Sequence, residues 1–193
     1  MILLFVGLAL TALMAYIIRQ LHFYLSPERF RQIVVPLIPT YLLINWVFTL
    51  FTRTPGEYPV VLVPFRAYIQ ILGWDIRSFA ELGQLLGGAW EDSAVPSLAP
   101  LIGVAQNIVL FLPFGFLLSA AYKHTSTEKF LALGFMLSLV IEACQLVFRL
   151  GWFEMDDLLH NVLGTYVGIR LYRRVIKLCL YCELSNRLFI RED

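Results

Sequence analysis

The sequence contains apolar stretches long enough to cross a lipid bilayer, and this feature limits the possible folds more than any other. A spanning helix needs about 20 mostly apolar residues. Stretches of about this length cover residues 1–18, 33–51, 100–122 and 130–148, and a shorter fifth stretch covers 156–171. Because hydrocarbon cannot satisfy backbone polar groups, each of them must be helical. We therefore predict an all-α fold, a polytopic membrane helix bundle of about five transmembrane helices.

The composition supports this assignment and argues against several classes of partner. Of 193 residues, 59% are apolar and only 15% are charged, which is untypical of soluble domains. The net charge of +1 also argues against a nucleic-acid partner. The first apolar stretch has no basic start and no small-residue cleavage site, so we expect a membrane anchor and not a removed signal peptide. Membrane lipids are the expected surroundings, and the oligomeric state is left open.

The distribution of Lys and Arg predicts the orientation, because cytoplasmic loops carry the excess of basic residues. One set of loops holds Arg19, Arg29, Arg31, Lys123, Lys129, Arg170, Arg173, Arg174, Lys177, Arg187 and Arg191, and the other holds Arg53, Arg66, Arg77 and Arg149. We therefore predict a multi-pass protein of the cell membrane with its N-terminus outside and its C-terminus in the cytoplasm. Residues 1–32 form a first span and its cytoplasmic loop, 33–172 form the membrane core, and 173–193 form a cytoplasmic tail. The outer loop of the core covers residues 52–98.

The outer loop is unusually apolar. Residues 60–74 (VVLVPFRAYIQILGW) are too few to span a bilayer and too apolar for water, so they should re-enter the membrane or lie in its interface. Apolar residues between 76 and 90 recur at helical spacing, which predicts an amphipathic surface helix. A loop that simply packs on the bundle fits the same pattern equally well.

Polar side chains occur at one level in three of the predicted spans. Glu142 lies roughly 9 Å below the outer end of its span, and Gln145 shares its face. Asp157 begins the last span, and Asn161 follows one turn deeper. Asn107 lies roughly 10 Å below the start of the third span. Because lipid cannot satisfy these groups, they should face one another.

Two interpretations of these residues remain open. Amides can bond across helices as structural glue for about 0.6–2 kcal/mol each. A carboxyl group costs more to bury, roughly 2.5–3.5 kcal/mol on insertion scales, and is therefore the stronger sign of a site. We predict one outward-opening pocket, lined by Asn107, Glu142, Gln145, Asp157 and Asn161 and covered by residues 60–74 with Arg66 pointing inward. Glu142 and Asp157 are the candidate acid and base, and Arg66, Asn107, Gln145 and Asn161 are the candidate ligand-binding residues.

Motifs for other chemistries are absent from the sequence. It has no phosphate-binding loop, no dinucleotide turn and no G-x-S-x-G nucleophile motif. The cluster of Glu154, Asp156, Asp157 and His160 could ligate a cation, but acids at a helix start complement the helix dipole without a metal. No cofactor and no metal are therefore expected.

Several motifs resemble the VanZ family. They are QNIVLFLPFGFLL at 106–118, SLVIEACQLVF at 138–148, EMDDLLHNVLGTYVG at 154–168 and VPFR at 63–66. The resemblance covers about residues 49–171. This chain departs from the family pattern in lacking the Asn of the N-x-x-PF-R element, and Glu154 replaces the first acid of the D-x-x-D pair. The founder of the family is associated with low-level resistance to the lipidated glycopeptide teicoplanin, which implies a cell-envelope role.

Three functional classes remain compatible with the sequence. The first is a protein whose pocket binds an amphiphile, such as a lipid-linked envelope precursor or a lipoglycopeptide antibiotic. The second is an intramembrane enzyme that uses Glu142 or Asp157 as acid or base on a lipid head group. The third is a small transporter or a partner-binding scaffold, and transport is least favoured because no polar chain crosses the first two spans. Binding is preferred, because no nucleophile and no set of oxyanion donors can be named.

Overall fold

Five long helices form a bundle in the computed structural model, which describes residues 2–51, 53–88 and 98–189. The long helices are α1 (Ile2–Tyr24), α2 (Pro27–Trp46), α5 (Ala99–Ala121), α6 (Thr127–Val147) and α7 (Met155–Phe189), and α2 continues as a π-helical turn, η1 (Val47–Phe51). The short elements are β1 (Val60–Val61), α3 (Arg66–Ile71), α4 (Phe79–Leu86) and β2 (Phe153–Glu154). The all-α prediction is confirmed, since the described strands have two residues each.

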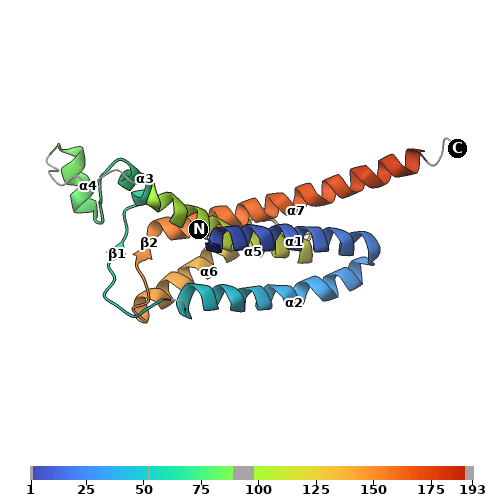
Figure 1. Ribbon diagram of the computed structural model, residues 1–193, viewed down its shortest axis with the longest axis horizontal. Helices are drawn as coiled ribbons and strands as arrows, with labels where there is room; N and C mark the ends of the chain where they lie inside the picture. Colours follow the sequence, from blue (N-terminus) through green and yellow to red (C-terminus); the bar gives the residue numbers. More distant parts are fainter. Residues whose placement is uncertain (1, 52, 89–97, 190–193) are drawn as a thin grey trace.

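The chain passes back and forth along the bundle (Figure 1). The N-terminus lies at the end that carries β1, β2, α3 and α4, which we call the strand end. The turns from α1 to α2 and from α5 to α6 lie at the other end, which we call the turn end. The long helix α7 runs from the strand end past the turn end (Figure 1).

Four of the described helices are long and apolar enough to cross a membrane, namely α1, α2 with η1, α5 and α6. The second span begins earlier than the predicted residue 33. Ser26 caps α2 by accepting a 3.5 Å hydrogen bond from the Arg29 N–H, and Pro27 occupies the first helical position, where its missing N–H costs nothing. The predicted fifth span lies in α7, which carries Asp156 and Asp157 in its first turn. That fifth span stays a prediction.

Helices α5 and α7 pack closely because small residues face backbone across their interface. A Cβ atom added to Gly168 of α7 would lie 2.0 Å from the Leu112 carbonyl oxygen of α5. In the other direction, a Cβ atom added to Gly115 of α5 would lie 2.0 Å from the Thr165 carbonyl oxygen. Small residues at helix interfaces let backbones approach in this way in membrane proteins. The close contact fixes how deep the polar groups of α5 and α7 lie relative to one another.

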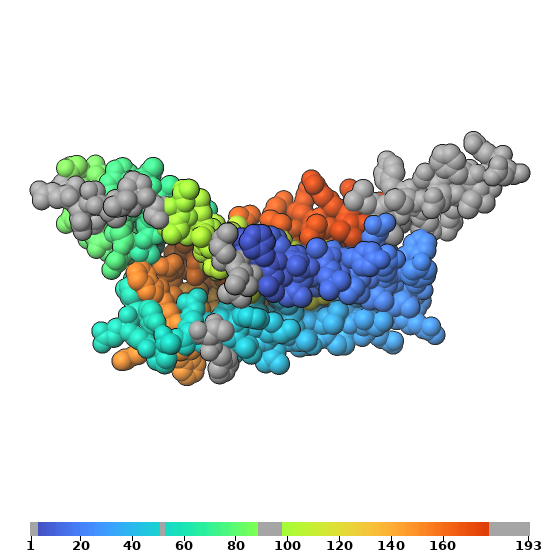
Figure 2. Space-filling model, viewed as in Figure 1, coloured from blue at the N-terminus to red at the C-terminus, as the bar shows by residue number. Residues whose placement is uncertain are grey.

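Large apolar side chains cover the outside of the bundle. Leu43 is 68% exposed and Val147 is 73% exposed, as expected of helices that face lipid and not water. The interior contains a cluster near the turn end, in which the Phe116 and Tyr172 rings meet edge to face at 5.4 Å. In the view of Figure 2, α1 and α2 form the near face of the bundle, and the residues around α3 and α4 project beyond the strand end.

The outer loop is tied to the connection between α6 and α7 by a parallel strand pair that the sequence did not predict. Val60 pairs with Phe153 and Val61 with Glu154. The predicted surface helix is present as α4, which is shorter than expected and starts with a capping box between Ser78 and Glu81. The predicted C-terminal end of that helix, at residues 89 and 90, lies outside the described residues.

Candidate functional site

Three helices bring polar side chains together near the strand end. Asn107 of α5 donates a 2.6 Å hydrogen bond from Nδ2 to Asp157 Oδ1 of α7. Glu142 of α6 is buried, and its Oε2 accepts a 3.2 Å hydrogen bond from the backbone N–H of Glu154. The Glu142 and Asp157 carboxyl groups are close enough to repel each other. The structure thus brings Asn107, Glu142 and Asp157 into one cluster, and their functional roles stay predictions.

Gln145 and Asn161 take partners outside this cluster. Gln145 Nε2 donates to the Thr49 carbonyl oxygen of η1 at 3.2 Å, and Asn161 Nδ2 donates to Ser138 Oγ of α6 at 2.8 Å. The side-chain oxygens of both amides are buried, and neither accepts a hydrogen bond from a described residue. Asn161 lies one helical turn deeper than Asp157, where Ser138 is within reach. This arrangement differs from the single pocket lined by all five residues that the sequence predicted.

Arg66 also differs from the prediction that it points into the pocket, because it pairs with acids outside the cluster of Glu142 and Asp157. Its guanidinium binds Asp75 through Nε at 3.0 Å and Nη2 at 2.5 Å, and it binds Glu154 through Nη1 at 2.9 Å. Its Cζ lies 4.7 Å from the centre of the Trp152 ring. The physical reason is the β1–β2 pair. It places Glu154 and Trp152 next to Arg66, and these contacts hold the Arg66 guanidinium away from the bundle interior.

The two acids beside Arg66 respond to this contact in different ways. Burial alone would raise the pKa of Asp75, but hydrogen bonds from Arg77, Arg66 and Gln70 outweigh burial and hold that pKa below its ordinary value. Burial raises the pKa of Glu154, and the nearby Arg66 only partly opposes it. Asp75 is therefore the firmer anionic partner of Arg66.

Two of the residues that were weighed as metal ligands, Asp156 and His160, hold α3 in place. Asp156 Oδ1 accepts from the Phe65 N–H, and its Oδ2 accepts from the Ala67 N–H at 2.9 Å, so that Asp156 caps the start of α3. His160 Nε2 lies 3.1 Å from the Tyr68 hydroxyl. Within the described ranges, no group of three His, Cys, Asp or Glu side chains could hold a metal ion.

Arg53 is a cation near the acids that the sequence pattern did not single out. It interacts electrostatically with Glu142 and Asp157. Its guanidinium passes over Gly151, because a Cβ atom added there would lie 2.3 Å from Arg53 Nη1 and 3.3 Å from Gln145 Oε1. The available signal was position in the sequence, since Arg53 follows the outer end of the second span directly. The apolar character of residues 60–74 pointed to Arg66 instead.

A cavity of about 250 Å³ lies between α1, α2 and α5, next to this cluster. Its lining consists of Val6, Gly7, Leu10, Tyr41, Ile44, Asn45, Phe48, Thr49, Arg53, Gln106, Asn107, Val109, Leu110 and Pro113. Since α2 runs toward the strand end and α5 runs away from it, Arg53, Gln106 and Asn107 lie nearest that end. The deeper lining around Leu10 and Pro113 is largely apolar. The cavity is therefore polar toward the strand end and mainly apolar further from it.

A turn of α5 next to Pro113 gives the deep part of the cavity its few polar contacts. Proline has no backbone N–H, so α5 cannot make the bond from residue 113 to the Val109 carbonyl. The next carbonyl, that of Leu110, accepts hydrogen bonds from the Tyr41 hydroxyl and from Asn45 Nδ2. These contacts fasten α2 to this part of α5.

The family model described as VanZ/LLP1 matches residues 8–177 of this chain. The chain belongs to the VanZ/LLP1 family. Over 67 residues it is also 33% identical to Protein VanZ of Enterococcus faecium, an alignment that covers 35% of this chain and 42% of that relative. The chain thus matches less than half the length of the curated relative. No solved structure matches it.

Family membership and the four apolar helices make this VanZ/LLP1 member a membrane protein. The family match begins inside α1, the helix that was expected to lie outside the core. The division at residue 32 stays a prediction. The α1 helix contributes Val6, Gly7 and Leu10 to the lining of the cavity.

Proposed function

We propose that this VanZ/LLP1 protein binds an amphiphile in the cavity between α1, α2 and α5. Arg53 and Asn107 hold the polar head of the ligand, and the apolar lining holds the start of its chain. The observation that carries this proposal is the change from polar to apolar lining along one cavity. An arginine fork suits a phosphate or a carboxylate, because it can donate two parallel hydrogen bonds.

The size of the cavity limits how much of the ligand it encloses. Pockets for drug-sized ligands measure about 300–1,000 Å³, whereas this cavity measures about 250 Å³. It therefore encloses a head group and a short part of a chain, and the rest of the amphiphile lies in the bilayer beside α1 and α2. Lipid-linked cell-wall precursors and acylated glycopeptides such as teicoplanin both have this build. We propose that binding one of them contributes to glycopeptide resistance, with the strand end outside the cell.

A second candidate function rests on the neighbouring Glu142 and Asp157 carboxyl groups. Two carboxyl groups that repel each other lose their protons in two separate steps. One can therefore keep its proton and act as a general acid while the other is ionised and acts as a general base. In this alternative, the protein cleaves or transfers a lipid head group instead of only binding it. The two functions differ in whether the ligand changes chemically.

The test replaces Arg53 by Gln and compares it with Arg149→Gln, which removes an equally exposed arginine at the same end that does not line the cavity. Binding of teicoplanin and of an unacylated glycopeptide to the purified protein is measured, together with the teicoplanin susceptibility of expressing cells. Losing a charge-assisted hydrogen bond should weaken binding of the acylated ligand by about 10-fold or more. Arg149→Gln should match the wild type.

Equal binding by the Arg53→Gln variant, or equal affinity for the unacylated ligand, would contradict the proposal. Mass spectrometry of lipids from cells with and without the protein decides between the two functions. A changed head group that disappears with Glu142→Gln would favour the enzyme.

A further inference from the structure

A second cavity lies at the turn end, far from the site described above. It measures about 260 Å³, and its lining consists of Pro27, Phe30, Arg31, Ala120, Ala121, Tyr122, Lys123, His124 and Thr125. The start of α2 forms one wall, and the end of α5 with the turn into α6 forms the other. The family resemblance and the proposed function make no use of these residues.

Two cations beside this cavity are held by aromatic rings. The Arg31 guanidinium lies 5.5 Å from the centre of the Tyr122 ring, and the Lys123 ammonium lies 5.7 Å from the centre of the Phe30 ring. Phe30 is only 2% exposed, so its ring is a fixed support. Lys123 Nζ also lies 3.0 Å from His22 Nε2. Stacking on a ring positions a cation but leaves its N–H groups free to donate.

No carboxylate neutralises these cations among the described residues. The ion pairs there join Arg66 to Asp75 and Glu154, and Arg77 to Asp75, all at the strand end. Among the described side chains, the acids at the turn end are Glu28 and Glu128, and neither forms an ion pair with Arg31 or Lys123. Glu128 interacts instead with Ser126 and Arg173. The cavity therefore presents positive charge that no described carboxylate neutralises.

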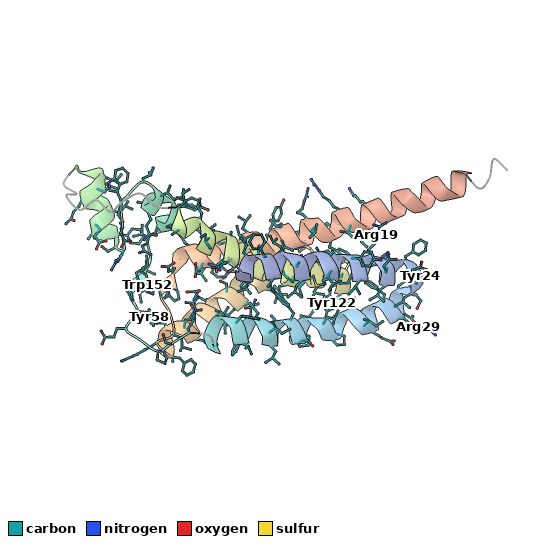
Figure 3. The ribbon with its side chains drawn as sticks, viewed as in Figure 1. Arg19, Tyr24, Arg29, Tyr58, Tyr122 and Trp152 are labelled. Atoms are coloured by element: carbon teal, nitrogen blue, oxygen red, sulfur yellow. The ribbon has the colours of Figure 1, made fainter. Side chains whose placement is uncertain are left out.

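The surroundings place this charge at the level of lipid head groups. Figure 3 shows Arg19, Tyr24, Arg29 and Tyr122 together at the turn end, a mixture of basic and aromatic side chains that is typical of a membrane interface. The cavity wall formed by Phe30, Ala120 and Ala121 is apolar and continues into the bundle. Basic pockets between membrane helices bind anionic lipid head groups in this way.

We propose that the turn-end cavity binds the phosphate of an anionic phospholipid, with Arg31 and Lys123 donating to its oxygens and His22 beside them. The acyl chains then lie against α2 and α5. This inference is independent of the amphiphile site at the strand end, because the two cavities share no residue.

The test measures the thermal stability of the purified full chain in detergent with increasing phosphatidylglycerol, phosphatidylcholine or inorganic phosphate. Wild-type protein should be stabilised by phosphatidylglycerol alone. The double variant Arg31→Gln/Lys123→Gln should bind this lipid at least about 10-fold more weakly, since the loss of even one charge-assisted hydrogen bond to the phosphate weakens binding by about that factor.

Two matched variants complete the experiment. Arg29→Gln/Lys129→Gln removes the same charge from equally exposed positions at the same end that do not line the cavity, and it should respond like the wild type. Arg31→Lys/Lys123→Arg keeps both charges and should retain the response, which separates charge from folding. Equal stabilisation by phosphatidylcholine, or an unchanged response of the Gln double variant, would overturn the proposal. Equal stabilisation by inorganic phosphate would show a soluble anion site and overturn the lipid assignment.

Discussion

Asn107 of α5 and Asp157 of α7 are joined by a 2.6 Å hydrogen bond at the level where the cavity meets the acid cluster. Asn107 lines the cavity and Asp157 does not, so this bond connects the proposed ligand site to the acids behind it. The bond also crosses the interface at which α5 and α7 pack most closely.

Replacement of Asn107 by Leu should destabilise the protein. The change leaves the Asp157 carboxylate without its amide donor, which costs about 1–3 kcal/mol for a charged partner in a buried setting. Gln106→Leu, at the neighbouring lining position, should cost less. Denaturant unfolding in detergent measures both. If the two variants unfold alike, the Asn107–Asp157 bond does not contribute to stability.

Helical geometry made much of this site predictable from the sequence. A rise of about 1.5 Å per residue was enough to place Asn107, Glu142 and Asp157 at one depth, and the cost of polar groups in lipid required them to meet. Periodicity within a helix also placed Asn161 beside Asp157, but it could not show that Ser138 of α6 would be nearer.

The contacts of the outer loop were not predictable in the same way. Two strands of two residues leave no periodic signal, yet the pairing of Val61 with Glu154 decides where Arg66 binds. The cavity was missed for a related reason, because it needs α1 beside α5 and no residue pattern specifies which helices are neighbours.

Gly168→Ala should destabilise the bundle by forcing its two most closely packed helices apart. The new Cβ atom would lie 2.0 Å from the Leu112 carbonyl oxygen, so α5 and α7 must separate. Overpacking of this kind costs about 1–3 kcal/mol. Gly103→Ala is the matched control on α5, because a Cβ atom there meets nothing within 4 Å. Thermal unfolding in detergent should show a loss for Gly168→Ala and no loss for Gly103→Ala.

Acidification should lower the stability of the folded protein through protonation of Asp75 in the outer loop. Its pKa is held below the ordinary value of 3.8 in the folded protein, so its bonds to Arg77, Arg66 and Gln70 stabilise the fold above that value. This contribution is lost as the pH falls through the folded pKa. The stability difference between wild type and Asp75→Asn should therefore be constant near neutral pH and shrink below about pH 4. Glu57→Gln, at an exposed site, should show no such trend, and a difference that stays constant through strongly acidic pH would rule out this role of Asp75.

Reporter fusions test the orientation that the basic residues predict. A fusion after Asp193 should read as cytoplasmic, and one inserted near Gly87 should read as external. The measurement uses a pair of reporters that are active on opposite sides of the membrane. An external C-terminus would place Arg53 and the cavity opening on the cytoplasmic side, and an extracellular antibiotic could then not be the ligand.

Two replacements of Glu142 separate the effect of its ionisable group on ligand binding from the effect of its hydrogen bond on stability. Gln keeps an oxygen that can accept the 3.2 Å bond from the Glu154 N–H, so Glu142→Gln should reach wild-type levels in the membrane and unfold at a similar temperature. Leu removes that acceptor and should cost about 1–3 kcal/mol, because the buried N–H loses its partner. Ligand binding should fall in the Gln variant even though the fold is intact, since Gln can neither ionise nor exchange a proton beside Arg53. Ser138→Ala removes a neutral polar group from the same helix and should leave binding unchanged. If Glu142→Gln binds teicoplanin as tightly as the wild type while Glu142→Leu only loses stability, Glu142 joins helices and takes no part in the ligand site.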